Sequence, residues 1–143
     1  MAIWFHTQNT NIKLLNLRFL KSWLKSEIFN FKKSPGTINV IFVTKAKILE
    51  INTQYLNHSY FTDIITFDYC EGNTLSGDIF ICPEVVEENS KMYDEKFNTE
   101  LKRVIIHGIL HLIGFDDKSD EEVSLMREIE DRCLSSVKEL LII

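Results

Sequence analysis

The sequence is best interpreted outward from residues 107–117, which read His107-Gly108-Ile109-Leu110-His111-Leu112-Ile113-Gly114-Phe115-Asp116-Asp117. Two histidines lie four residues apart in an apolar run, and residues at that spacing lie on one face of a helix, one turn apart. A glycine three residues after the second histidine can end the helix. The stretch therefore predicts a helix that ends in a sharp turn with two carboxylates close behind it.

The spacing of these side chains is that of a metal site. His107 and His111 can direct imidazole nitrogens at one ion, at about 2.0–2.1 Å for zinc. Gly114 can adopt a positive φ without steric cost, so the chain can turn back and bring Asp117 to the ion as a third ligand. The fourth position is left to water, as in catalytic zinc sites. A bare pair of histidines is more often two partly buried polar side chains, and the added glycine and carboxylate shift the interpretation to a metal.

The pattern HxxxHxxGxxD is similar to the zinc site of metzincin proteases, with one difference. Those enzymes carry a glutamate after the first histidine as general base, and here that position is Gly108. Peptide hydrolysis by that route is therefore disfavoured. A glycine inside a helix costs about 1 kcal/mol relative to alanine, which suggests close approach by backbone or substrate. Asp116 is a competing ligand, and we interpret it as a residue that orients a ligand.

Composition and length indicate one ordinary globular domain. The 143 residues are 45% hydrophobic and 26% charged, which is typical of such proteins. We find no apolar run of about 18 residues and no signal peptide, so we expect a cytoplasmic protein without a membrane segment. The cysteines are Cys70, Cys82 and Cys133; they form no CxxC pair, and we expect them to be reduced packing residues.

Charge is distributed unevenly along the chain. Residues 1–49 carry eight Lys/Arg and one acid, a net +7, whereas residues 50–143 carry eight Lys/Arg and twenty acids, a net −12. The acidic total argues against strong non-specific binding of DNA or RNA. Arg18, Lys21 and Lys25 in the basic third could still guide a phosphate backbone, although a solvated helix face accounts for them equally well.

Periodicity and turn residues predict an α+β fold. Strands are expected at 3–6 (on an edge), 37–44, 63–67 and 77–82, and helices at 11–31, 45–57, 83–93, 98–113 and 119–141. Residues 34–36 are expected to form a turn and residues 68–76 a loop, which leaves open whether strands 63–67 and 77–82 form a hairpin. One domain over 1–143, a small mixed sheet of about four strands packed with about five helices, is the simplest account. The metal site falls on a helix and the loop that follows it.

Three motifs together resemble one known family. Residues 107–116 resemble the signature H-G-x-L-H-L-x-G-[YF]-D-H of the YbeY endoribonucleases, metal-dependent proteins of ribosomal RNA maturation and ribosome quality control in bacteria. Residues 62–67 resemble the T-D-V-L-S-F strand of that family, residues 77–79 its G-D-I, and Asn52 its L-N. Glu122 and Met126 also match, so the resemblance spans about residues 40–130.

Two positions depart from the family pattern. The resemblance implies a histidine as third metal ligand where this chain has Asp117, and an arginine after N-x-x-Y where this chain has Leu56. A carboxylate lowers the charge of the site to about +1 and makes bound water less acidic. It also makes iron, nickel or manganese suitable beside zinc, the metal we expect. Arg103 or a lysine of the basic third could replace the missing arginine, although a solvated charge on a helix face explains Arg103 equally well. Asp63 is a candidate for a catalytic carboxylate, although an aspartate at the start of a strand is more often a cap or turn residue. His6 is expected to be structural or exposed, and His58 has no assigned role.

The resemblance implies a metal-dependent endonuclease that hydrolyses single-stranded RNA during ribosomal RNA processing. Its partners would be single-stranded RNA, ribosomal RNA or the ribosome, with no membrane or DNA partner. The alternative is a ribosome- or RNA-binding factor whose nuclease activity is weak or lost, which both departures favour. A metal-dependent hydrolase of another small substrate is a third interpretation.

Overall fold

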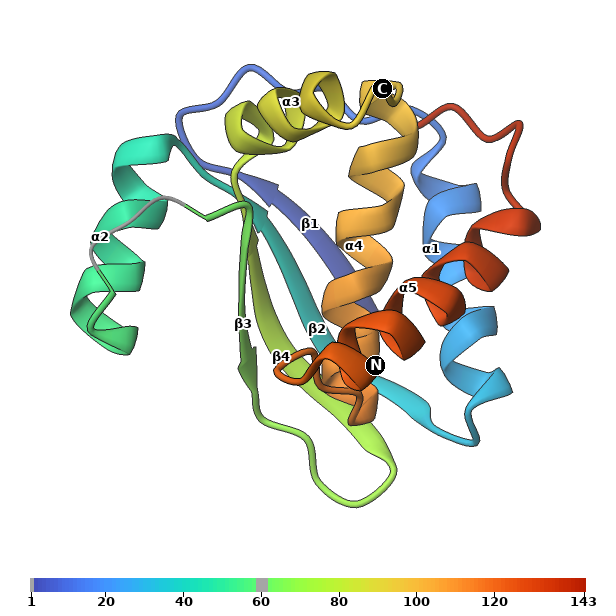
Figure 1. Ribbon diagram of the computed structural model, residues 1–143. Helices are drawn as coiled ribbons and strands as arrows, with labels where there is room; N and C mark the ends of the chain where they lie inside the picture. The colour runs from blue at the N-terminus through green and yellow to red at the C-terminus, as the bar shows by residue number, and fades with distance from the viewer. Residues whose placement is uncertain (1, 59–61) are drawn as a thin grey trace.

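The computed structural model describes residues 2–58 and 62–143 of the chain. The elements follow one another as β1 (Ala2–Thr7), α1 (Leu17–Asn30), β2 (Ser34–Phe42), α2 (Lys45–Leu56), β3 (Ile64–Asp68), β4 (Thr74–Ile81), α3 (Pro83–Met92), α4 (Phe97–Ile113) and α5 (Asp120–Ser135) (Figure 1). The described residues therefore contain the four strands and five helices that the sequence predicts. Among them, no helix is both long and apolar enough to cross a bilayer.

The strands form one mixed sheet in the order β1-β2-β4-β3. β1 pairs with β2 and β2 pairs with β4 in parallel, whereas β3 and β4 are antiparallel with Ile64 opposite Ile81. The edge position predicted for the first strand is confirmed. β3 and β4 do form the hairpin that the sequence left open, and Gly72 at φ 58° lies in the turn between them.

The alternation of side chains along the strands creates two apolar layers. On one face, Ile38, Val40 and Ile79 join the main core with α1, α4 and α5. On the other, Ile65 packs with residues of α2 and α3 in a smaller cluster. Figure 1 shows α4 crossing in front of the sheet and α2 standing apart at the edge formed by β3.

Helix α4 lies closest to the sheet and is buried on almost every side. A Cβ added at Gly108 would lie 2.9 Å from Cγ2 of Ile79 and 3.0 Å from Cδ1 of Ile64. The close approach expected at this glycine is therefore the packing of α4 on β4 and β3. The helix ends at Gly114, whose φ of 126° turns the chain as predicted.

Some element boundaries differ from the sequence prediction. Residues 34–36 belong to β2, which has an irregular register between Pro35 and Ile38, and the turn before it includes Lys32 at φ 63°. Helix α1 begins at Leu17 instead of residue 11, directly after Asn16 in the left-handed region at φ 56°. The expected turn at 34–36 was wrong because proline and glycine are tolerated at the irregular end of a strand as well as in turns.

Helix α5 ends at Ser135, six residues earlier than predicted. The Lys102 ammonium donates to the main-chain oxygens of Val137 at 2.6 Å and Leu140 at 2.9 Å. The Asn98 amide oxygen accepts from the main-chain N–H of Ile142 at 2.7 Å. These side chains of α4 satisfy the backbone of the last residues, so the apolar pattern there continues without a helix.

Candidate metal centre

His107, His111 and Asp117 form a tight triangle of ligand atoms. The two Nε2 atoms are 3.0 Å apart, and Oδ2 of Asp117 lies 3.2 Å from Nε2 of His107 and 3.4 Å from Nε2 of His111. Atoms that bind one tetrahedral zinc at about 2.0–2.1 Å are about 3.3 Å from one another. The three side chains could therefore hold one ion and leave a coordination position open.

The local fold explains how a loop residue reaches the helix. Gly114 ends α4 with its N–H bonded to the main-chain oxygens of Leu110 and His111. Five residues later, Ser119 and Glu122 form a reciprocal capping box that fixes the start of α5. Asp117 lies between these two fixed ends, so its position is defined by the backbone on both sides.

Glu130 of α5 orients the first histidine. Its Oε2 lies 2.5 Å from Nδ1 of His107, and its side chain is only 5% exposed. A ring that donates its Nδ1–H to this carboxylate keeps the lone pair of Nε2 free for an ion, an arrangement common among metal-binding histidines. The donor set and its support therefore fit a divalent metal.

Glu130 was missed in the sequence because it is 23 residues from His107 and acts through tertiary packing. The signal that could have found it is its position on α5, four residues after Met126 and three before Cys133, within the buried stripe. An acid at such a position requires a partner. Asp116, which we expected to orient a ligand, is exposed.

Arg103 supports the same network and is not the solvated charge considered above. Its guanidinium donates to Glu130 at 3.0 Å and to Asp131 at 2.6 Å, and the residue is buried. The two carboxylates balance its charge, and its buried Nε–H has no partner among the described residues. Arg103 therefore holds Glu130, which in turn holds His107.

Opposing effects set the pKa of His107. Burial alone would lower its pKa, but the hydrogen bond and charge of Glu130, with the charges of Asp117 and Asp63, raise it overall. In the metal-free protein this ring therefore retains a proton more strongly than an exposed histidine.

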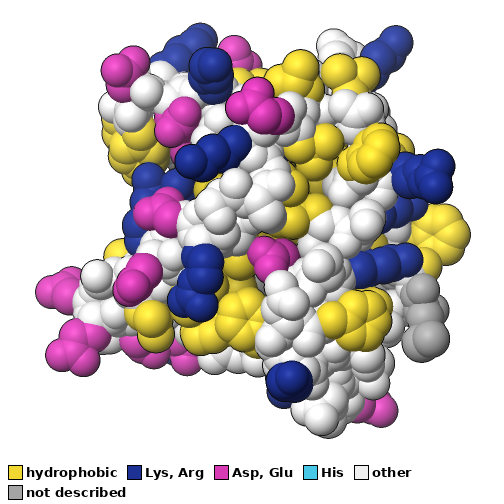
Figure 2. Space-filling model, turned by 90° about the vertical axis from the view of Figure 1, so that its right-hand side faces the viewer, with side chains coloured by type: hydrophobic (Ala, Val, Ile, Leu, Met, Phe, Trp, Pro, Cys, Tyr) yellow, Lys and Arg dark blue, Asp and Glu magenta, His cyan; other side chains and the backbone are white. Residues whose placement is uncertain are grey.

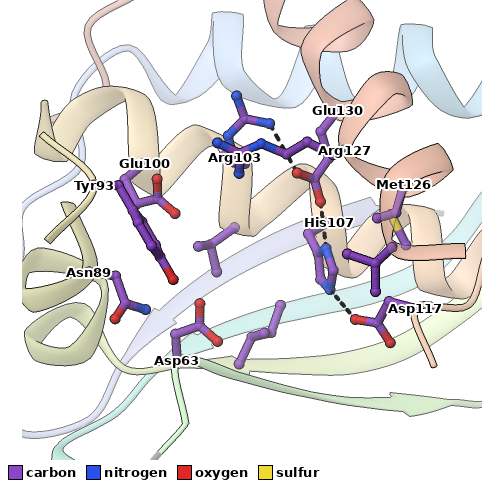
Figure 3. A pocket seen from close by; sticks show the side chains of 13 residues that line it. Asp63, Asn89, Tyr93, Glu100, Arg103, His107, Asp117, Met126, Arg127 and Glu130 are labelled. Carbon is purple, nitrogen blue, oxygen red and sulfur yellow. Dashed lines mark hydrogen bonds and ion pairs between the residues drawn. The ribbon is translucent and has the colours of Figure 1, made fainter. Parts of the chain in front are cut away.

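A cavity of about 300 Å³ opens beside His107 and Asp117. Its walls come from α3 and the residue after it, from α4, from α5 and the loop before it, and from the start of β3 with the residue before it. Figure 3 shows the polar side chains of these walls around the same space. Those side chains are Asp63, Asn89, Tyr93, Glu100, Arg103, Arg127 and Glu130. The metal triangle thus lies at one side of a polar pocket.

Asp63 is placed in this wall, as the strand motif suggested. Burial raises the pKa of its carboxyl, against the opposing charge of His107 and hydrogen bonds that include the Asn89 amide. The structure brings Asp63 to one cavity with His107 and Asp117; the catalytic role of Asp63 stays a prediction.

The basic side chains predicted to guide RNA are elsewhere. Arg18, Lys21 and Lys25 lie on α1, with Lys21 5.4 Å from the ring centre of Trp4, and none of the three is among the described residues that line the cavity. Figure 2 shows the side of the molecule turned away from α2, where Lys and Arg are mixed with apolar and acidic side chains and no histidine is visible. The role of Arg18, Lys21 and Lys25 in RNA binding stays a prediction.

The fold and site define an α+β protein in which two histidines and an aspartate could bind a metal beside a polar cavity. The family model described as Endoribonuclease YbeY matches residues 3–138, and the chain belongs to this family. An Endoribonuclease YbeY of Bacteroides fragilis is 45% identical over 139 residues, which cover 97% of this chain and 100% of the relative. One of Flavobacterium johnsoniae is 48% identical over 122 residues, 85% of this chain and 88% of the relative.

A solved structure has the same fold. The solution structure of TM1509 from Thermotoga maritima is 29% identical, with a TM-score of 0.65 over 96% of this chain and 92% of that one. The family and fold predicted from the motifs are thereby confirmed.

Proposed function

We propose that this protein is a metal-dependent endoribonuclease that cuts single-stranded RNA. The observation that carries the proposal is the triangle of ligand atoms, 3.0–3.4 Å apart, at the side of a cavity. Its relatives are named endoribonucleases, which supports RNA as the substrate. Zinc is the proposed metal, and iron, nickel or manganese also suits two histidines and a carboxylate.

His107, His111 and Asp117 would hold the ion. When bound, it would polarise a phosphate oxygen and lower the pKa of a bound water. Glu130 keeps the His107 ring in the orientation that presents Nε2. Asp63 is the candidate to accept a proton, since it lines the same cavity and burial moves its pKa upward, toward the range that suits a general base.

Ribosomal RNA processing and ribosome quality control are the proposed setting, with the ribosome as partner and the cytoplasm as location. The family membership supports this setting. The basic side chains of α1 would contact RNA phosphates beyond the cavity without reading sequence.

Single-turnover cleavage of a labelled single-stranded RNA tests the proposal. Wild type is compared with His111→Ala, and with Lys118→Ala as a control in the same loop region, at matched circular dichroism and measured metal content. We expect His111→Ala to lose both stoichiometric metal and cleavage, and Lys118→Ala to keep both. Equal cleavage by wild type and His111→Ala would reject the proposal that this protein is a metal-dependent endoribonuclease.

A binding factor with weak or lost nuclease activity is the second candidate. Asp117 in place of histidine and Leu56 in place of arginine favour it. In that case wild type binds RNA and one equivalent of metal but does not cut under single-turnover conditions.

A further inference from the structure

Arg127 and Tyr93 are among the cavity side chains that the proposed chemistry does not use. Arg127 projects from α5 and Tyr93 follows the end of α3, so they approach the cavity from facing helices. Figure 3 shows both with the metal ligands His107 and Asp117 around the same space. The question is which ligand chemistry they would recognise.

The charged side chains of the cavity wall differ in whether they have a bonded partner. The carboxyl groups in the cavity wall belong to Asp63, Glu100, Asp117 and Glu130, and the guanidinium groups to Arg103 and Arg127. Arg103 is committed to two carboxylates at 3.0 and 2.6 Å, whereas no hydrogen bond or ion pair of Arg127 is found in the described part of the chain. Arg127 is therefore the lining cation without a carboxylate at bonding distance; its charge acts on the nearby Glu100 carboxyl, and its guanidinium donors are open to an anionic ligand.

Tyr93 offers a surface of a different kind. Its side chain reaches the cavity although the residue is 59% exposed, and no ring contact to it is found among the described residues. An aromatic ring that is more than half exposed at the edge of a cavity suits stacking with a nucleobase, which every base allows. Together, the guanidinium of Arg127 suits the phosphate of a nucleotide and the ring of Tyr93 suits its base.

We propose that the cavity binds one nucleotide of single-stranded RNA beside the bond that is cut, with the Arg127 guanidinium on its phosphate and the Tyr93 ring against its base. This inference rests on the proposed function, because it takes RNA as the ligand. Arg127 then supplies the substrate contact that Leu56 cannot make, while the two terminal nitrogens of Arg103 stay bound to Glu130 and Asp131. Stacking sets no base preference by itself.

The test is direct binding of a 2′-O-methyl single-stranded oligonucleotide of about ten nucleotides, followed by fluorescence anisotropy over a range of salt and checked afterwards for intact ligand. For Arg127→Ala we expect the slope of log K against log salt to fall by about 0.7, one phosphate contact on a single strand. For Tyr93→Ala we expect affinity to fall by about 5- to 150-fold with the slope unchanged, because stacking carries no charge. Arg127→Lys should keep the slope, and Tyr93→Phe the affinity.

Two matched variants control for general effects. Arg132→Ala removes an exposed arginine from the same helix, and Tyr69→Ala removes a tyrosine of similar exposure, 58%, from the other end of β3. Neither residue is among those that line the cavity, and both variants should bind like wild type. A slope change in Arg127→Ala no larger than in Arg132→Ala, or wild-type affinity in Tyr93→Ala at an unchanged melting temperature, would overturn the proposal.

The assay is independent of cleavage. Suppose that Arg127→Ala lowers the salt slope and Tyr93→Ala lowers the affinity, but wild type does not cut RNA. The nucleotide site is then supported and the proposed nuclease activity is rejected. If His111→Ala abolishes cleavage but neither the salt slope of Arg127→Ala nor the affinity of Tyr93→Ala changes, the nuclease activity is supported and the nucleotide site is rejected.

Discussion

Replacing Glu130 by glutamine should weaken metal binding although Glu130 is not itself a ligand. The carboxylate lies 2.5 Å from Nδ1 of His107 and is almost fully buried. In Glu130→Gln the amide oxygen can still accept from Nδ1–H, but the amide NH2 then faces the Arg103 guanidinium, which is also a donor. The negative charge that makes Nε2 a stronger donor to the metal is lost as well. The ring also becomes freer to rotate, because the bond to a neutral amide is weaker.

The size of the effect follows from the type of contact. Outer hydrogen-bond partners of metal-binding histidines typically contribute about 10- to 100-fold in metal affinity, which corresponds to about 1.4–2.8 kcal/mol. The protein itself should lose less than the 3–5 kcal/mol of a broken buried ion pair, because Arg103 keeps Asp131 at 2.6 Å. Metal affinity should therefore fall while the metal-free protein still folds.

Competition with a chelator of known zinc affinity measures this change directly. Thermal unfolding with and without excess zinc gives a second readout, because a ligand of the native state stabilises it in proportion to the logarithm of its affinity. Glu128→Gln, an exposed change two residues away on α5, is the control and should bind zinc like wild type. Wild-type zinc affinity in Glu130→Gln would refute the claim that Glu130 positions His107.

Two further substitutions and one labelling experiment test the packing and the buried groups. Gly77→Ala should destabilise the protein by about 1–3 kcal/mol in a denaturant titration, because the new Cβ would lie 2.5 Å from a main-chain oxygen of β3. Glu100→Gln should raise the melting temperature near neutral pH, because burial raises the pKa of this carboxyl in spite of two nearby arginines. The gain should shrink as the pH falls below the ordinary pKa of glutamate, where the wild-type carboxyl is protonated in both states. The thiols of Cys70 and Cys133, whose pKa values burial raises to about 11 and about 12, should react with a disulfide reagent at pH 8 only after unfolding.

Each of these expectations has a result that opposes it. Gly72→Asn is the control for Gly77→Ala, because Gly72 has open space around its Cβ position and a φ of 58° that asparagine accepts; equal stability of the two variants would contradict the packing argument. A Glu100→Gln protein that is less stable than wild type at neutral pH would contradict the cost of the buried carboxylate. Rapid labelling of Cys133 in the native protein would show that its site opens readily.

Local patterns made α4 and the grouping of His107, His111 and Asp117 predictable. The helix spacing of His107 and His111, the turn at Gly114 and the cap at Ser119 are each encoded within a few residues, and the structure reproduces the helix, the turn and the cap. The alternation of the strands and the family motifs likewise predicted the sheet. These features do not depend on which distant element packs against them.

Contacts between elements that are distant in the sequence could not be predicted from local sequence patterns. Glu130 and Arg103 acquire their roles only because α5 packs on α4, and the end of α5 depends on Lys102. Tyr93 and Arg127 are separated by more than thirty residues in the sequence and meet at one cavity. A side chain whose partner is supplied by tertiary packing carries no signal in its own neighbourhood.

The short connection between Gly114 and Ser119 also bears on how this family can change. Because caps at both ends fix the backbone of the connection, we expect these caps, and not the side chain at position 117, to set the course of the backbone there. A single substitution can therefore exchange an imidazole for a carboxylate without a compensating change in the fold. Metal preference and water acidity become evolvable traits of one residue, tunable separately from the stability of the domain that carries it.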